Sequence, residues 1–410
     1  MALPTTEFGP GDLVTAEDPY ATFCTLRSRG PVLRSGGSWI VVGHAEAEAV
    51  LRCPDARSGF IAELYRGLLP PGAAREEMGH RINFLDPPDH TRVRRLVSKA
   101  FTPRRSEALR PYVAELARGL LAPLPADAPI DLIARFAHAV PSLVISELLG
   151  VPGADRDRLT ALADRVANLL GLAGLDPARR DDAVAAAEEM HATLRALLDA
   201  RRRAPAEDLL SALLAAEEEQ QRLSESELLS LAATLYSAGH RTTRDLFSSG
   251  LAVLLGEPDV LRALRAGALP ATAVVEEMLR FETPTHYVAR KLVRPLALGG
   301  VTIPAGEPIT VLLAAANRDP KAYADAERFD PSRWCREPAP PAVLSFAFGP
   351  HFCLGASLAR LEAETMLTTL LAERPHVALT DAPLRWRHTG LFRGLHGLPV
   401  VLGPHEGGGR

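Results

Sequence analysis

The sequence predicts a mainly α-helical protein with small β-sheets. Apolar residues recur at helical spacing through most of the 410 residues. Strand-like alternation is confined to two short pieces, Val32 to Val42 and Pro295 to Ala315. One helix, from Ser224 to about Leu255, is long enough to cross a whole domain, because about 1.5 Å per residue gives a span of roughly 48 Å.

Local signals justify the individual elements. Trp39 to Val42 is an apolar run typical of a strand, and Gly299-Gly300 predicts the turn of a hairpin, with an extra strand after it. Ser224 and Glu227 have the spacing of a capping box, so they mark the start of the long helix, which ends at Gly256-Glu-Pro258. Two further helices are expected over Ala271 to Phe281 and over Leu354 to Ala372.

Composition narrows the class of protein. A hydrophobic content of 47% allows a large core, and length alone permits two or three domains. The net charge of −4 lacks the basic excess that nucleic-acid-binding proteins carry, so the composition does not indicate such a partner. Met1 to Tyr20 is polar and has neither the apolar stretch of a signal peptide nor a run long enough to span a bilayer, so we expect a soluble protein without a membrane anchor. Because the four cysteines lack paired spacing, we expect a reducing compartment, the cytoplasm. The cysteines are Cys24, Cys53, Cys335 and Cys353.

One cysteine has an unusual setting. Cys353 stands between Gly349 and Gly355, just before the predicted helix from Leu354. The glycines let the backbone approach a flat ligand, and the N-terminus of the helix stabilises a thiolate. A thiolate in this position is a strong axial donor to iron. A buried structural cysteine is the alternative for any isolated cysteine.

The segment from Phe346 to Arg360, with Phe346, Gly349, His351, Cys353 and Gly355 in the pattern F-x-x-G-x-H-x-C-x-G, resembles the cytochrome P450 family. The resemblance implies one cytochrome P450 domain over residues 1–410. It also implies a haem b cofactor (iron protoporphyrin IX) whose iron is bound by Cys353. The expected activity is that of a haem-thiolate monooxygenase.

The middle of the long helix reads Ala238-Gly239-His240-Arg241-Thr242. In similar proteins small residues here admit haem and O₂, and an acid and an alcohol relay protons; this chain keeps Ala238, Gly239 and Thr242. Arg241 replaces the acid and cannot relay a proton in the same way. It either binds a substrate carboxylate or pairs with Asp245, leaving Thr242 and water to carry protons. The angle of about 100° between residues 241 and 242 favours the second interpretation.

The resemblance assigns further residues. Glu277 and Arg280 match a structural E-x-x-R pair that binds an arginine downstream, here Arg333, although such a pair alone is common on helix surfaces. Haem propionates need cations or hydrogen-bond donors. Four residues at matching positions are expected to supply them, and each could instead be solvated: His90, Arg94, Arg290 and His351.

Partners follow from charge. A basic cluster can receive an acidic ferredoxin, itself reduced by a ferredoxin reductase, although a solvated face is the alternative. The cluster contains Arg92, Arg95, Lys99, Arg104, Arg105 and Arg360. Peroxide is the competing oxidant, because Arg241 alters the proton relay.

By resemblance, the substrate lies against four variable segments. They are Phe60 to Arg81, Val166 to Asp182, Thr283 to Ala289 and Gly390 to Leu395. Polar groups at Thr285, His286 and Tyr287 and a possible cation at Arg393 favour a polar or carboxylate-bearing small molecule. We expect hydroxylation, epoxidation, coupling or desaturation of a secondary metabolite. The candidate substrate residues are Thr285, His286, Tyr287, Phe392 and Arg393. A non-catalytic helper protein of the same fold is the alternative from a different functional class.

Overall fold

The computed structural model describes residues 5–9, 11–12, 18–174, 176–218 and 221–404. Part of the polar stretch 1–20 therefore lies outside the described residues. The chain forms two compact units. Unit 1 contains residues 1–56, 110–140 and 242–410, and unit 2 contains residues 57–109 and 141–241. The prediction of a single domain remains a prediction.

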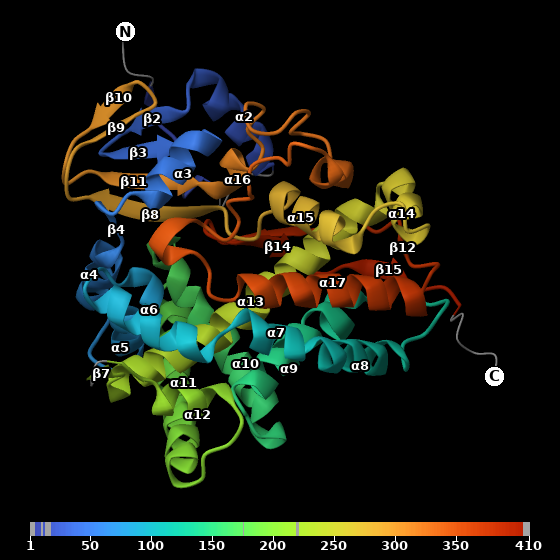
Figure 1. The fold of residues 1–410 in the computed structure, drawn as a ribbon, viewed down its shortest axis with the longest axis horizontal. Helices are drawn as coiled ribbons and strands as arrows, with labels where there is room; N and C mark the ends of the chain where they lie inside the picture. The colour runs from blue at the N-terminus through green and yellow to red at the C-terminus, as the bar shows by residue number, and fades with distance from the viewer. Residues whose placement is uncertain (1–4, 10, 13–17, 175, 219–220, 405–410) are drawn as a thin grey trace. The chain divides into compact units, whose positions relative to one another are not determined.

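Unit 1 is built on a six-stranded mixed sheet whose strand order is β1-β2-β3-β11-β8-β4. Figure 1 shows β2, β3, β11 and β8 side by side. The predicted strand over 32–42 is two strands, because the chain turns back at Gly36-Gly37 and β2 pairs antiparallel with β3. The strands are β1 (Thr5–Thr6), β2 (Val32–Ser35), β3 (Ser38–Val41), β4 (Ala56–Arg57), β8 (Tyr287–Leu292) and β11 (Pro308–Leu312).

Smaller sheets complete the β-structure. β9 (Leu296–Leu298) and β10 (Val301–Ile303) form the hairpin expected around Gly299-Gly300. β13 (Trp386–His388) pairs with β14 (Arg393–Leu395), and a three-stranded sheet has the order β12-β15-β5. The remaining strands are β5 (Ile130–Asp131), β12 (Ala378–Leu379), β15 (Pro399–Val401) and, in unit 2, β6 (Glu217–Glu218) and β7 (Gln221–Arg222).

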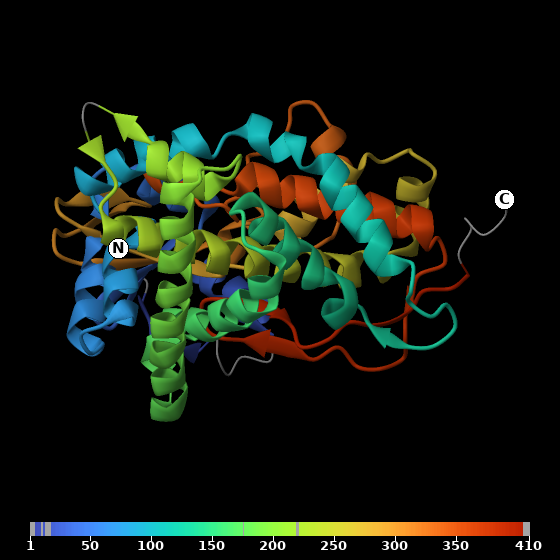
Figure 2. The same cartoon turned by 90° about the horizontal axis from the view of Figure 1, so that it is seen from below.

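Helices make up most of both units. In unit 1, α17 packs against α8 and α15, and Figure 2 shows α17 beside α8. The helices of unit 1 are α2 (Pro19–Arg29), α3 (His44–Arg52), α8 (Arg110–Leu121), α14 (Pro258–Arg265), α15 (Ala271–Phe281), α16 (Leu313–Ala316) and α17 (Ala356–Glu373). Those of unit 2 are α4 (Gly59–Leu68), α5 (Ala73–His80), α6 (Asp89–Ala100), α7 (Pro103–Ala108), α10 (Gly153–Val166), α11 (Pro177–Arg203) and α12 (Leu209–Ala215).

Two helices have residues in both units. They are α9 (Ala139–Leu148) and the long predicted helix, α13 (Glu225–Leu255). The capping box is present at the start of α13: the Glu227 amide donates to Ser224 Oγ (3.2 Å), and the Ser224 amide donates to the Glu227 carboxylate (2.8 Å). The boundary between the units in α13 falls between Arg241 and Thr242.

No single helix in the described ranges is long and apolar enough to cross a bilayer. One sharply bent pair, Ile133–Leu148 with Gly153–Gly171, meets the length and composition requirements only jointly.

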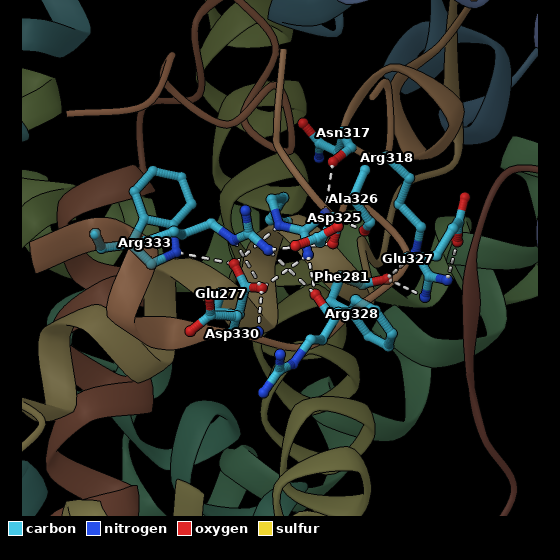
Figure 3. A network of polar contacts seen from close by, with 12 residues as sticks. Glu277, Phe281, Asn317, Arg318, Asp325, Ala326, Glu327, Arg328, Asp330 and Arg333 are labelled. Carbon is cyan, nitrogen blue, oxygen red and sulfur yellow. Dashed lines mark hydrogen bonds and ion pairs between the residues drawn. The ribbon is translucent and has the colours of Figure 1, made fainter. Parts of the chain in front are cut away.

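A buried charge network organises the loop that follows α16. Glu277 on α15 is fully buried, and its carboxylate binds Arg280 (2.7 Å) and Arg333 (3.1 Å). Trp334 Nε1 and the amide of Asp330 also donate to Glu277. Figure 3 shows Arg333 and Asp330 converging on this carboxylate. The network thus satisfies a charge that would otherwise be costly to bury.

The two arginines of this network also bind main-chain carbonyls. Arg280 donates to the carbonyl oxygens of Asn317, Ala326 and Arg328. Arg333 donates to the carbonyl of Ala324. These bonds hold an irregular segment that has little regular secondary structure of its own, so the charge network serves as its scaffold.

Replacing Glu277 by glutamine removes the charge that faces the two buried arginines. We expect the free energy of unfolding to fall by about 3–5 kcal/mol, the cost of leaving buried charges uncompensated. Urea unfolding of the haem-loaded protein, followed by circular dichroism, measures this loss.

The matched control changes the adjacent residue. Glu276 pairs with Arg360, and these side chains retain 24% and 35% of their accessible surface. Because that pair is partly solvated, Glu276→Gln should cost about 1 kcal/mol or less. Equal losses in the two variants would contradict the scaffold role of Glu277.

Candidate functional site

Cys353 lies on a loop between a short 3₁₀ turn, η5 (Gly349–His351), and the start of α17 at Ala356. The Cys353 amide donates to the carbonyl of Phe346 (3.0 Å), and the Phe352 amide donates to the carbonyl of Gly349 (3.0 Å). These two bonds close the loop on itself. The cysteine is therefore held by main-chain geometry.

The backbone packs too closely around position 349 for any residue other than glycine. The φ of Gly349 is +68°, and a Cβ at this position would lie 2.4 Å from the carbonyl oxygen of Leu51. Only glycine meets both conditions without displacing the backbone. The Cys353 loop therefore sits directly against the end of α3.

A second set of bonds joins the Cys353 loop to the buried scaffold. Asn317 accepts from the amide of Leu344 (2.8 Å) and donates to Ser345 Oγ and Thr283 Oγ1 (2.8 Å each). The Ser345 hydroxyl donates to the carbonyl of Leu279 (2.6 Å). Since the carbonyl of Asn317 is itself bound by Arg280, the segment before Phe346 is tied to the Glu277 network.

The surface around Cys353 suits a flat macrocycle. Cys353 is exposed, and Phe352 beside it retains 36% of its accessible surface although it is a large apolar residue. Arg360 stacks on another aromatic residue of this segment, Phe346, with 4.6 Å between guanidinium and ring centre. Within the described residues no cluster of three or more His, Cys, Asp or Glu side chains could hold a metal ion alone. A single thiolate is a sufficient protein ligand only when a macrocycle supplies the others.

The middle of α13 is open at one position. Ala238 is exposed, although Ser237 and His240 are buried. Because Ala238 is exposed, the surface of α13 is not covered by other side chains at this position. This opening fits the small residue that was expected near the cofactor.

Gly239 has a packing role that the sequence did not reveal. A Cβ there would lie 3.0 Å from two side-chain atoms of Ile145 on α9. Its small size therefore lets α9 approach α13. Admission of haem and O₂ at Gly239 remains an expectation.

Thr242 is half-buried and Arg241 is buried, with 7% of its surface exposed. Asp245, the partner considered for Arg241, receives two hydrogen bonds from Arg387 of β13 (2.8 and 2.9 Å) and one from Arg244 (2.9 Å). Its charge is thus already compensated by two arginines. This weakens the reason for Arg241 to pair with it, and both interpretations of Arg241 stay open.

The four candidate propionate ligands are distributed over both units. In unit 2, His90 is buried and Arg94 is half-buried, and both lie on α6. In unit 1, Arg290 is buried on β8, where it donates to the carbonyl of Ala289 (2.8 Å), and His351 is half-buried in η5. Buried cations and donors of this kind suit an anionic ligand.

The candidate substrate residues separate into two groups. Thr285, Tyr287 and Phe392 are half-buried, and a β-bridge joins Thr285 to Phe392. Arg393 and His286 are buried, and their side chains are engaged inside unit 1. Arg393 binds Glu282 (3.2 Å) and His388 (2.7 Å) and stacks on the ring of Trp386.

Glu282 is the centre of this second network. It accepts from the hydroxyl of Tyr20 (3.2 Å) and also pairs with Arg318 (3.3 Å). His286 packs against Tyr20 and Phe23, with ring centres 6.1 and 5.7 Å apart. Substrate binding by Arg393 and His286 stays a prediction, since these internal contacts do not test it. The contacts hold the β13–β14 turn against the end of α15.

The same contacts keep both histidines neutral. Burial, reinforced by Arg393, lowers the pKa of His388 to about 4, and burial holds the pKa of His286 well below its usual range. Since an arginine always donates, His388 Nε2 must accept from Arg393, which requires the neutral ring.

The fold and the cysteine site together define a haem-thiolate protein. The family model for cytochrome P450 matches residues 66–268 and 270–374. The chain belongs to the cytochrome P450 family, which confirms the predicted fold class and the thiolate-bound haem, and it is a cytochrome P450 monooxygenase. When bound, haem supplies the chemistry of oxygen activation.

Individual relatives cover nearly the whole chain. The chain is 40% identical to cytochrome P450 monooxygenase PikC of Streptomyces venezuelae, over 94% of this chain and 91% of that protein. It is 36% identical to 6-deoxyerythronolide B hydroxylase of Saccharopolyspora erythraea, over 94% and 96% of the two chains. The crystal structure of CalO2 superposes with a TM-score of 0.89 at 31% identity, covering 97% of this chain and 99% of the other.

Gly349→Ala tests the close packing behind Cys353. Gly306 also has a positive φ, +82°, but a Cβ there would have open space. We expect Gly306→Ala to lower the free energy of unfolding by about 1–2 kcal/mol through backbone strain alone. Gly349→Ala should cost more and should also reduce the haem content of the purified protein. Identical haem content in both variants would contradict the packing argument.

The neutral histidines make stability depend on pH. In the unfolded chain His388 becomes protonated below a pH of about 6.5, whereas in the native state it stays neutral until the pH reaches about 4. The free energy of unfolding should therefore decrease as the pH is lowered from about 6.5 to about 4. Unfolding midpoints in urea at pH 7 and pH 5 should differ less for His388→Gln than for the native sequence. A larger difference for the variant would contradict the assignment.

Proposed function

We propose that this monooxygenase oxidises a small secondary metabolite by hydroxylation, epoxidation, coupling or desaturation. The observation that carries this proposal is the exposed Cys353, held on a rigid loop at the start of α17. The names of relatives support the substrate class, since they include 6-deoxyerythronolide B hydroxylase and mycinamicin IV hydroxylase/epoxidase. In this proposal Thr242 and water deliver protons, and the cofactor is haem b. Its propionates are bound by His90, Arg94, Arg290 and His351.

We assign the electron supply to a ferredoxin and its reductase. Exposed basic residues on α6 and α7 would meet the acidic partner. Within the predicted cluster, Arg92 binds Glu227 and Arg360 binds Glu276. Four members are exposed: Arg95, Lys99, Arg104 and Arg105. None of the four cysteines, all of which are described, forms a disulfide, and we propose that the protein acts in the cytoplasm.

Peroxide-driven oxygenation is the second candidate, and Arg241 is the observation that favours it. A buried arginine at the position of the usual acid cannot relay protons as a carboxylate does. Hydrogen peroxide already contains the two electrons and two protons that O₂ would have to receive. Oxygenation with peroxide therefore requires fewer protons from a relay. Product formation with peroxide alone, at the rate reached with ferredoxin, would establish this route.

Metabolite profiling tests the oxidation itself. Mass spectrometry compares the source organism carrying Cys353→Ala with one carrying Cys335→Ala, which alters another exposed free cysteine. We expect only the first to accumulate a precursor. A precursor lacking one oxygen indicates hydroxylation or epoxidation, and one with two extra hydrogens indicates coupling or desaturation. An unchanged profile would contradict the proposal and favour a non-catalytic helper.

Charge reversal tests the docking surface. The double variant Arg95→Glu, Lys99→Glu should slow reduction by ferredoxin at least about tenfold at low ionic strength, and added salt should shrink this difference. Reduction by dithionite, which needs no docking, should be unaffected. The control Arg179→Glu reverses an exposed charge on α11, where 76% of the side-chain surface is accessible. Equal slowing by the control would contradict docking on α6.

A further inference from the structure

Unit 2 contains a buried polar cluster that none of the assignments above explains. Glu77 on α5 and Arg81, which follows α5, form an ion pair of 2.7 Å with 0% and 3% of their side-chain surfaces exposed. Arg81 also donates to the hydroxyl of Ser237 on α13 (3.3 Å). His191 of α11 approaches the second carboxylate oxygen of Glu77 to 3.4 Å. Three helices thus contribute polar groups to one buried location.

Several polar atoms of this cluster lack a hydrogen-bond partner. They are Arg81 Nε and Thr234 Oγ1, together with Glu77 Oε2 and His191 Nε2, which lie 3.4 Å from each other without forming a hydrogen bond. All four residues are more than nine-tenths buried. Leaving one such atom unsatisfied costs about 1–3 kcal/mol, so a folded protein rarely tolerates several together unless another molecule binds them.

The positions along α13 place the cluster beside the opening at Ala238. Ser230, Thr234, Ser237 and Arg241 follow one another at intervals of four, three and four residues, so they share one face of the helix. The Ser230 hydroxyl donates to the carbonyl of Glu77 (2.9 Å), which shows that this face meets α5. Thr234 stands one turn before the exposed Ala238. Its hydroxyl therefore lies at the border between the buried cluster and the open part of the helix.

The charges indicate what kind of group would bind. Glu77 compensates Arg81, so the pair carries no net charge and attracts neither a carboxylate nor an ammonium group strongly. The second oxygen of Glu77 faces His191 Nε2 at 3.4 Å, so the open positions are a donor on Arg81 and a hydroxyl on Thr234 that can donate or accept. A hydroxyl group complements this set, because it donates one hydrogen bond and accepts others.

We infer that Glu77, Arg81 and Thr234 form a substrate subsite that binds a hydroxyl group of an otherwise apolar small molecule. The inference rests on the proposed function, since it names a feature of the substrate that the monooxygenase oxidises. It narrows the sequence-based expectation of a polar or carboxylate-bearing substrate. The subsite selects a neutral polar group and lies in unit 2.

Isothermal titration calorimetry on the haem-loaded full chain tests the subsite with three probes of similar shape: cyclohexylmethanol, cyclohexanecarboxylate and cyclohexylmethylammonium. We expect the alcohol to bind several-fold more tightly than either ion. Thr234→Val removes the open hydroxyl with little change of shape, and should weaken binding of the alcohol about tenfold, equivalent to one hydrogen bond. Binding of the two ions should change less than about twofold.

The control is Thr193→Val on α11, where the hydroxyl already bonds the carbonyl of Glu189 (2.9 Å) within its own helix. This variant should bind all three probes as the native protein does. The inference is overturned if the native protein shows no preference for the alcohol, or if Thr234→Val leaves the preference intact. In that case the cluster holds only structural water. A failure of the proposed function is recognised separately, by a native metabolite profile in the Cys353→Ala organism.

Discussion

The structure depends on one buried carboxylate. Glu277 neutralises two arginines that together bind five main-chain carbonyls of the segment between α16 and η4 (Pro331–Cys335). Through Asn317 the same network holds Leu344 and Ser345, directly before the residue that accepts the Cys353 amide. Leu344 and Ala347 also pack in an apolar cluster with residues of β3 and β11. The charge network and this apolar cluster therefore together hold the segment that precedes the exposed Cys353.

Two further charge networks, one in each unit, have different roles. Glu282, Arg393 and His388 fix the β13–β14 turn in unit 1, whereas Glu77 and Arg81 form the buried cluster in unit 2. Both pair a carboxylate with arginine, and in the second Arg81 Nε and Thr234 Oγ1 have no hydrogen-bond partner. The first network thus positions the backbone, and the second is available to a ligand. A family fold shared with many relatives can in this way accommodate substrates that differ in their polar groups.

The sequence predicted those features that rest on local signals. The capping box at Ser224, the bounds of α15 and the Cys353 loop follow from residues close together in the chain. The Glu282–Arg393 pair joins residues 111 positions apart, and no periodicity announces it. From the sequence we therefore predicted Arg393 as a cation that binds substrate, and its ion pair with Glu282 became evident only in the structure. The break at Gly36-Gly37 had a local signal, since paired glycines between two apolar runs predict a hairpin turn.

The central claim is that Cys353, as a thiolate, binds the haem iron. The most direct test is the absorption spectrum of the purified, dithionite-reduced protein under carbon monoxide. Our account predicts the long-wavelength Soret band that distinguishes thiolate-bound haem from haem bound by a neutral histidine. A fully folded, haem-loaded protein that shows only the shorter-wavelength band of histidine-bound haem would contradict it.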